Sequence, residues 1–230
     1  MSEWSAHVLR HGPLTQLAPR MWQVTGTMKN MPLPRNMTIW RMADGGLWIH
    51  SAVACDDATM AEIEALGQPS VLVVPNGYHR LDAGVWKDRY PGMRVVCPEG
   101  SRAKVGEVLK VDALDSEVPG VITHGAGLKA SENIYEVDAG AGNGLVVCDA
   151  LFNVAHIPGF MGFVLKIIGS TGGFKMTNIA RFAVLEDKKA FAQWMEQAAA
   201  SPDLALLCLS HGDAVLADAA RKLKDAAAAL

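Results

Sequence analysis

The 230-residue sequence lacks a hydrophobic run long enough to cross a membrane. Its longest apolar stretch lies between Phe160 and Ile168 and is interrupted by Gly162 and Lys166, whereas a spanning helix needs about 20 apolar residues. The first residues (MSEWSAHVLRHGPLTQ) also lack the basic start and apolar core of a secretory signal. From these absences we expect no membrane span and a cytoplasmic location.

Cysteine is scarce as well, since the chain has 4 and no two of them form a CxxC pair. Three of them, Cys97, Cys148 and Cys208, end apolar runs, where free cysteine behaves as a small hydrophobic side chain. This spacing disfavours a disulfide framework or a cysteine zinc site. We therefore expect buried, reduced thiols.

The sequence also lacks a large excess of either charge, since its 21 Lys and Arg are nearly balanced by 24 Asp and Glu, which gives a formal net charge of −3. Without a bulk positive field we expect no nucleic-acid partner. No GxSxG nucleophile elbow and no GxxxxGK[ST] phosphate loop occurs. The glycines at 140, 142 and 144 lie in a hairpin-like turn that opens no helix, so no dinucleotide site is predicted.

The sequence is instead rich in apolar residues, which make up 50% of it. Residues 21–51 read as β-strands with a hairpin turn at Asp44-Gly45-Gly46. Continuous apolar runs, typical of strands buried on both faces, then alternate with helical segments, and they occupy residues 70–74, 93–97, 144–148 and 204–209. Because hairpins followed by strand–helix units occur once per half, we predict an N-terminal arm (residues 1–20) and a single α/β (α+β) domain (residues 21–230).

Polar or ionisable side chains follow these buried strands. His79 lies in the loop after the first, Asp149 directly follows the third, and His211 follows the last. Ligands bind outside the carboxyl ends of strands in such sheets, and these side chains can ligate metals or transfer protons. Each could instead only cap a turn, but three such residues at the strand ends favour a site. His50, within a strand, and His124, in a loop, are weaker candidates.

The order of motifs resembles the metallo-β-lactamase-fold superfamily, in particular a degenerate-site branch of unknown function, from about Met21 onward. Four passages carry the resemblance: MTIWRMADGGLWIHSAV, VLVVPNGYHRLDAGVWKDRYPGMRVVCPEG, GLVVCDALFN and LCLSHGD. The resemblance implies a four-layer αββα sandwich, in which two mixed β-sheets lie face to face with helices outside.

The resemblance also implies where metal ligands should lie. The superfamily's hydrolases hold two metals with a His-x-His-x-Asp-His loop, a further histidine, a bridging aspartate and a final histidine. Asp149 matches the bridging aspartate and His211 the final histidine, while His124 is a candidate for the further one. His50-Ser51 stands where an aspartate usually ends the early strand.

The metal loop itself departs from the pattern. Asn76 and Tyr78 replace the first two histidines, and only His79 and Asp82 lie nearby. A neutral amide or phenol is a poor metal ligand, and a catalytic zinc needs three protein ligands plus an open position. We therefore expect no dinuclear site.

Two hypotheses remain open. The first is a mononuclear hydrolase of a small ester, thioester or phosphoester, in which His79, Asp149 and His211 hold one divalent metal (zinc, or manganese or iron). In it Asp149 and Asp82 are the catalytic carboxylates, with Asp82 in proton transfer. The second is an inactive binding or interaction protein on the same scaffold, without metal.

The segment Asn153–Asn178 is rich in glycine and large apolar side chains. It reads as a buried helix, as a lid that brings Phe160, Phe163 and Phe174 over a small-molecule substrate, or as the surface of a homodimer. The residues alone do not decide among these three.

Overall fold

Two β-sheets form the centre of the protein, of which the computed structural model describes residues 3–230. The larger sheet has seven strands in chain order, antiparallel from the first to the fourth and parallel from there on. Its strands are β1 (Thr15–Ala18), β2 (Met21–Met28), β3 (Met31–Arg41), β4 (Leu47–His50), β5 (Pro69–Val73), β6 (Arg94–Cys97) and β7 (Ala113–Leu114).

The second sheet has the order β13-β10-β9-β8, and only its β10–β13 pair is parallel. Its strands are β8 (Ile122–His124), β9 (Ile134–Asp138), β10 (Asn143–Val147) and β13 (Leu204–Leu209). A separate antiparallel pair joins β11 (Phe152–Val154) to β12 (Gly173–Lys175).

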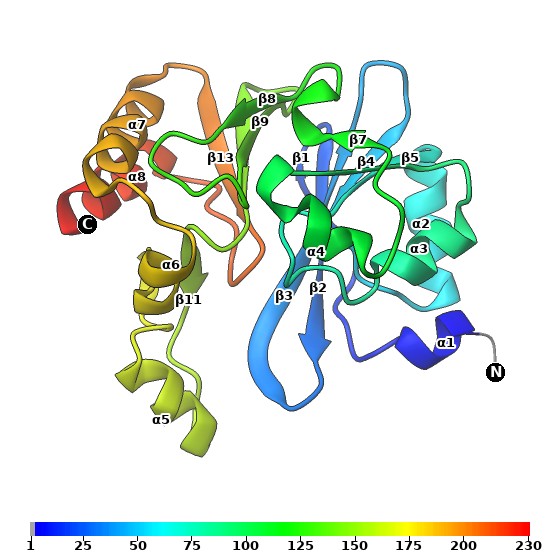
Figure 1. Cartoon of the computed structure of the whole chain (residues 1–230), viewed down its shortest axis with the longest axis horizontal. Coiled ribbons are helices and arrows are strands. Elements are labelled where there is room, and N and C mark those ends of the chain that lie inside the picture. The colour runs from blue at the N-terminus through cyan, green and yellow to red at the C-terminus, as the bar shows by residue number, and fades with distance from the viewer. Residues whose placement is uncertain (1–2) are drawn as a thin grey trace.

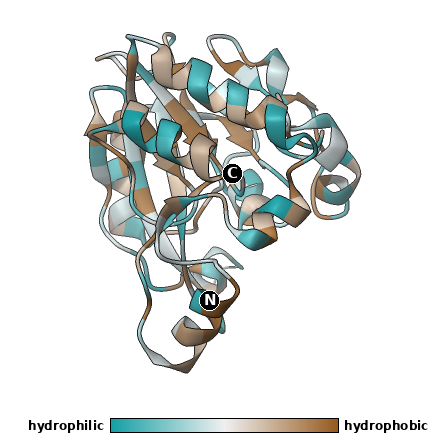
Figure 2. Cartoon of the chain, turned by 90° about the vertical axis from the view of Figure 1, so that its left-hand side faces the viewer, coloured by the Kyte–Doolittle hydropathy of each residue, from teal (hydrophilic) through white to brown (hydrophobic). Residues whose placement is uncertain are grey.

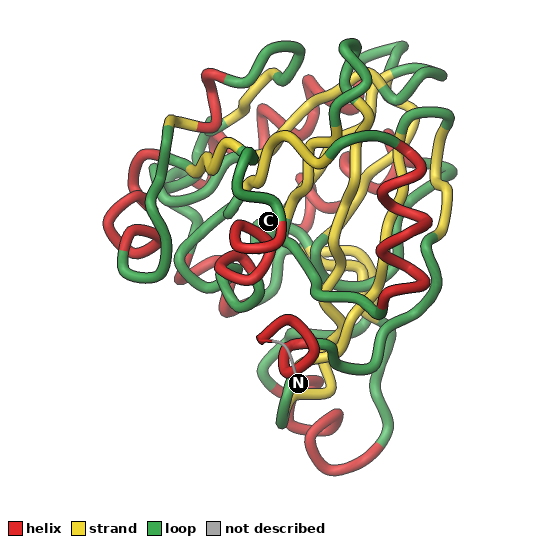
Figure 3. The backbone as a smooth tube through the Cα atoms, turned by 90° about the vertical axis from the view of Figure 1, so that its right-hand side faces the viewer, coloured by secondary structure: helices red, strands yellow, loops and turns green. Residues whose placement is uncertain are grey.

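Helices cover the outer faces of both sheets (Figure 1). On one side, α2 (Asp57–Leu66) and α3 (Ala83–Arg89) lie outside the seven-stranded sheet, and Figure 3 shows red helices in front of its yellow strands. On the other side, α7 (Lys188–Ala200) and α8 (Ala219–Ala229) cover the second sheet, and their ribbons alternate between teal and brown as amphipathic helices do (Figure 2). The arrangement is the αββα sandwich that the resemblance implied.

The remaining helices are short. They are α1 (Glu3–His7), α4 (Arg102–Gly106), α5 (Gly159–Ile167), α6 (Asn178–Ala183) and the 3₁₀ turns Glu99–Ser101 and Asp115–Glu117. Within residues 3–230, no helix combines the length and apolar character needed to cross a membrane. All four cysteines are buried and free, as expected.

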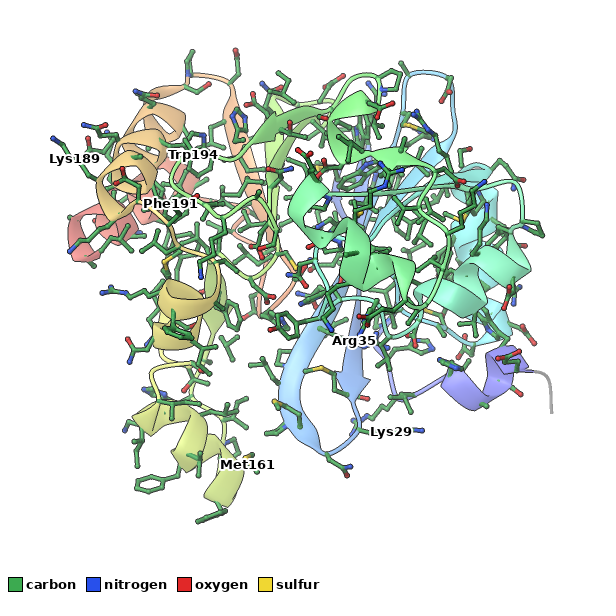
Figure 4. All side chains as sticks on the ribbon, viewed as in Figure 1. Lys29, Arg35, Met161, Lys189, Phe191 and Trp194 are labelled. Atoms are coloured by element: carbon green, nitrogen blue, oxygen red, sulfur yellow. The ribbon has the colours of Figure 1, made fainter. Side chains whose placement is uncertain are left out.

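The apolar strand runs are explained by burial on both faces. Along β3, for example, Met37 and Ile39 pack in the cluster under α2 and α3, whereas Trp40 packs between the sheets. A third cluster lies under α7 and α8, where the Asp187 carboxylate caps α7 and Phe191 is fully buried (Figure 4). Three apolar layers thus hold four structural layers together.

The last helix, α8, begins only at Ala219, because Val215 exchanges backbone hydrogen bonds with Leu207 and Asp218 has φ = 58°. The predicted N-terminal arm, residues 1–20, includes β1, which pairs with β2 of the larger sheet. Trp4 also packs edge-on against Trp86 at 5.8 Å.

Candidate metal centre

Three of the predicted residues converge at the carboxyl ends of the strands. The Asp149 Oδ1 atom lies 3.3 Å from Nε2 of His79 and 3.2 Å from Nε2 of His211. The two Nε2 atoms are themselves 3.2 Å apart. Since His79 follows β5 of the larger sheet and the other two follow β10 and β13, the site joins the two sheets.

This triangle of one oxygen and two nitrogens fits a metal ion. Tetrahedral zinc with bonds of about 2.0–2.1 Å places neighbouring ligand atoms about 3.3 Å apart, by simple geometry. The three edges of 3.2 to 3.3 Å match one face of such a tetrahedron. A zinc held by these three residues would have a position open to a water or substrate oxygen, as catalytic zinc requires.

The histidine rings are held by their other nitrogens. The Nδ1 atom of His211 lies 2.8 Å from the carbonyl oxygen of Pro34, which can only accept, so Nδ1 carries the proton. In the neutral ring, Nε2 then presents its lone pair to the centre, as in known zinc sites. Nδ1 of His79 lies 2.8 Å from the Ser51 hydroxyl, which orients that ring in the same way.

Asn76 stabilises the site through hydrogen bonds and does not act as a metal ligand in place of the histidine of the superfamily's loop. Its Nδ2 donates to Asp149 Oδ2 at 2.8 Å and to Glu132 Oε2 at 3.0 Å. Its Oδ1 accepts from the backbone N–H groups of Tyr78 at 2.9 Å and His79 at 3.1 Å. The amide therefore fixes both the loop and the Asp149 carboxylate, whereas the Tyr78 side chain is 84% exposed.

Glu132 is a site residue that sequence reasoning missed, because it lies in a short loop with no motif around it. Its side chain is fully buried, and Oε1 accepts from the Ala150 N–H at 2.6 Å. Burial, reinforced by the negative charge of Asp149, raises the pKa of Glu132 well above its ordinary value. Burial also opposes ionisation of Asp149, but His79 and His211 outweigh it and hold the Asp149 pKa well below its usual range. Of the two carboxyl groups, Glu132 and Asp149, it is therefore Asp149 that carries the negative charge.

Cys148 also lies close, with ligand atoms of His79, Cys148 and Asp149 all within 4.8 Å of one another. Burial raises the pKa of the Cys148 thiol well above its ordinary value, with the charges of Asp149 and Glu132 adding to the effect. His211 is the better third ligand, because its Nε2 lies 3.2 Å from both His79 Nε2 and Asp149 Oδ1.

Asp82, predicted to transfer protons, lies in a separate buried network. Its Oδ2 accepts from the Arg35 guanidinium and from the Ala54 N–H at 2.9 Å, and its Oδ1 lies 3.1 Å from Nδ1 of His7. His7 is thus part of this network. No hydrogen bond or ion pair found within residues 3–230 joins Asp82 to His79, Asp149 or His211.

His124 lies outside the triangle as well. Its Nε2 is 2.8 Å from Glu136 Oε2, and its ring faces Trp194 at 5.5 Å. These contacts place it on β8, where it forms an ion pair if protonated, and they give it no role at the centre.

His50 belongs to a polar layer between the sheets. Within residues 3–230, the buried side-chain atoms that lack a hydrogen-bond partner are Asn36 Oδ1, Thr38 Oγ1, His50 Nδ1, His50 Nε2 and Ser210 Oγ. Thr38 pairs with His50 across β3 and β4, and the Asn36 N–H donates to the Ser210 carbonyl at 2.8 Å. Buried polar groups are costly without partners. This part of the layer between the sheets is therefore suited to hold further polar groups that bond to these atoms.

Burial of His50 predicts a pH-dependent stability. Burial lowers the pKa of His50 from 6.5 to about 3. Below pH 6.5 the unfolded chain takes up a proton on His50 while the folded chain does not. The free energy of unfolding therefore falls by about 1.4 kcal/mol per pH unit, or by about 2 kcal/mol at pH 5.

Urea unfolding at pH 7.5 and pH 5 should show this fall in the free energy of unfolding. In His50→Leu the fall between the two pH values should be about 2 kcal/mol smaller. The exposed control His156→Gln should keep the wild-type loss; equal losses in all three proteins would contradict the assignment.

A cavity of about 310 Å³ opens beside Asp149. Its other walls are Tyr78, Phe152 and four residues of or next to α6, namely Thr177, Ile179, Ala180 and Ala183. The three predicted lid residues are not in this lining. Phe160 and Phe163 lie on α5 with 81% and 59% exposure, and Phe174 packs partly buried against the α7/α8 cluster. Figure 4 shows α5, which carries Met161, extending away from the two sheets, and Met161 is 44% exposed, so α5 is not a buried helix.

Comparisons with known proteins identify the fold. No protein-family model matches the sequence, and no curated protein matches it. Among solved structures, the mono-zinc FIM-1 metallo-β-lactamase of Pseudomonas aeruginosa is 15% identical, with a TM-score of 0.60 over 97% of each chain. A metallo-β-lactamase from Pontibacter korlensis is 12% identical, with a TM-score of 0.58 over 96% of this chain and 100% of the other. The protein therefore has the metallo-β-lactamase fold, as its motifs implied.

Proposed function

We propose that the protein is a metal-dependent hydrolase with a mononuclear centre held by His79, Asp149 and His211. The observation that carries this proposal is the triangle of ligand atoms with edges of 3.2 to 3.3 Å. Two imidazoles and one carboxylate form a known ligand set of catalytic zinc and also of Fe(II), with manganese as a further alternative. When bound, such an ion lowers the pKa of a coordinated water to about 7 and so supplies a nucleophile at neutral pH.

The chain's own residues would position the reacting groups. Ser51 and the Pro34 carbonyl orient the two rings, and Asn76 fixes the Asp149 carboxylate, so that the ligands need no rearrangement on binding. Asn76 and Tyr78 supply no second set of ligands, which restricts the proposal to one ion. The substrates proposed are small esters, thioesters or phosphoesters. The four buried free thiols support the proposed cytoplasmic location.

A metal-free binding protein is the second candidate, favoured by one specific contact. The 3.2 Å separation of the two Nε2 atoms is also a hydrogen-bond distance, so one ring can donate to the other without an ion. Metal content distinguishes the two functions.

Metal content per chain is the decisive measurement, made on protein purified without chelators or metal-affinity steps and then supplemented in turn with zinc, manganese and iron. We expect about one equivalent in the parent and almost none in His79→Ala or His211→Ala, because two remaining ligands hold a divalent ion poorly. His124→Ala, which removes a histidine outside the triangle, should retain the full equivalent. A parent that takes up no metal from any of the three, or equal loss in His124→Ala, would overturn the hydrolase proposal.

A further inference from the structure

The walls of the cavity beside Asp149 are mostly apolar. Phe152 and Ala180 are buried, and the hydroxyl of Thr177 already accepts from the Ala180 N–H at 3.0 Å as the cap of α6. Apart from Asp149, no lining residue is charged. Its volume of about 310 Å³ lies at the lower end of the range for small-ligand pockets, about 300–1,000 Å³.

The mouth of this cavity carries large apolar side chains that are exposed to solvent. Tyr78 is 84% exposed and Ile179 is 55% exposed, and they line the cavity from two different segments, the loop after β5 and α6. Exposed apolar groups that gather around a concave site mark a surface that binds an apolar partner. Because Asp149 also lines this cavity, that partner would reach the metal centre.

A second cavity, of about 290 Å³, lies on the other side of Tyr78 and has a different character. It shares Tyr78 and Ala183 with the first cavity but is also lined by Arg80 and Lys104. Glu107 pairs with both cations, at 2.8 Å from Arg80 and 3.1 Å from Lys104, so this group keeps one net positive charge. An anionic group is therefore favoured in the second cavity.

From these neighbouring cavities we propose a substrate class: esters or thioesters of an apolar acid whose leaving group carries a negative charge. The acyl chain would lie between Tyr78 and α6, the scissile carbonyl would face Asp149, and the anionic group would lie toward Lys104. This inference rests on the proposed hydrolase function, since it assigns the substrate of the same centre. Hydrolysis adds water across the acyl bond, so the products are the apolar carboxylic acid and the anionic alcohol or thiol.

The apolar half of the proposal is tested by binding, without any need for turnover. The probes are n-alkyl sulfonates of two, four, eight and twelve carbons, which a hydrolase of this class does not cleave, titrated calorimetrically into zinc-loaded and zinc-free protein. Affinity should rise by about fourfold per added methylene until the cavity is filled, because each buried methylene contributes about 0.8 kcal/mol. Ile179→Asp should abolish this dependence, whereas Phe182→Asp, on the same helix but outside the lining, should preserve it.

The charged half is tested with Lys104→Glu. This variant should weaken the octyl sulfonate at least tenfold while leaving neutral octanol unaffected. Lys110→Glu, which reverses the charge of an 88% exposed lysine outside both cavities, is the matched control.

The outcomes separate this inference from the function on which it rests. Binding that is independent of chain length in a protein that holds one zinc would overturn the substrate class and leave the hydrolase proposal standing. Binding that depends on chain length and on Ile179, in a protein that holds no metal, would support the apolar cavity and overturn the hydrolase proposal. Equal weakening in Lys104→Glu and Lys110→Glu would overturn the anionic half.

Discussion

Asp82→Ala should lower the free energy of unfolding by about 3–5 kcal/mol, the largest stability loss that the structure leads us to expect from a single substitution. Asp82 is 1% exposed and Arg35 is 6% exposed, and the two form a buried ion pair. Removing the carboxylate leaves the guanidinium charged and unpaired inside the protein, and it also removes the acceptor of the Ala54 N–H. Urea unfolding at neutral pH, followed by circular dichroism, measures the loss.

Two further variants test the cause. The paired replacement Arg35→Met with Asp82→Leu removes both charges at once, so it should recover most of the lost stability. Asp138→Ala breaks an ion pair with Arg20 in which the aspartate is 59% exposed, and it should cost no more than about 1 kcal/mol. If Asp82→Ala instead left stability unchanged and removed hydrolysis, Asp82 would have the proton-transfer role that the sequence suggested.

The fold could be predicted because its signals are local. Four continuous apolar runs ended at polar residues, and each run is a strand buried on both faces in the structure. The same logic placed His79, Asp149 and His211 at one edge, since side chains that follow strands of facing sheets converge there. Strand order and the pairing of the two sheets came from the resemblance rather than from the pattern of residues.

The partners of the site residues could not be predicted in this way. Glu132 reaches Asn76 across 56 positions of sequence, and Arg35 reaches Asp82 across 47, with no motif that links either pair. Their pairing depends on tertiary contacts that only the folded chain specifies. For the same reason the apolar segment at residues 153–178 could be read as core, lid or interface, although its phenylalanines do not line the cavity.

Asp149→Asn should abolish hydrolysis and lower metal affinity by more than about 100-fold, beyond the 10- to 100-fold that loss of a residue orienting a ligand typically costs. The amide keeps the shape of the side chain but lacks the negative charge that His79 and His211 share through Oδ1. It also turns an acceptor into a donor at one of the two oxygens, so either the ligand contact or the Asn76 contact is lost. Zinc titration against a chromophoric competitor gives the affinity, and turnover of a short-chain ester gives the activity.

Glu132→Gln is the matched comparison, because it changes a carboxyl group that touches Asn76 and the Ala150 N–H but none of the three ligand atoms. Asn76 would still fix the loop through its contacts with Tyr78 and His79, so this variant should bind one zinc with affinity reduced about 10- to 100-fold. A zinc affinity that falls in the order parent, Glu132→Gln, Asp149→Asn distinguishes a ligand from a residue that positions it. If Glu132→Gln lost metal as completely as Asp149→Asn while remaining folded, Glu132 would itself have to be counted among the ligands, and the centre would not be the triangle proposed.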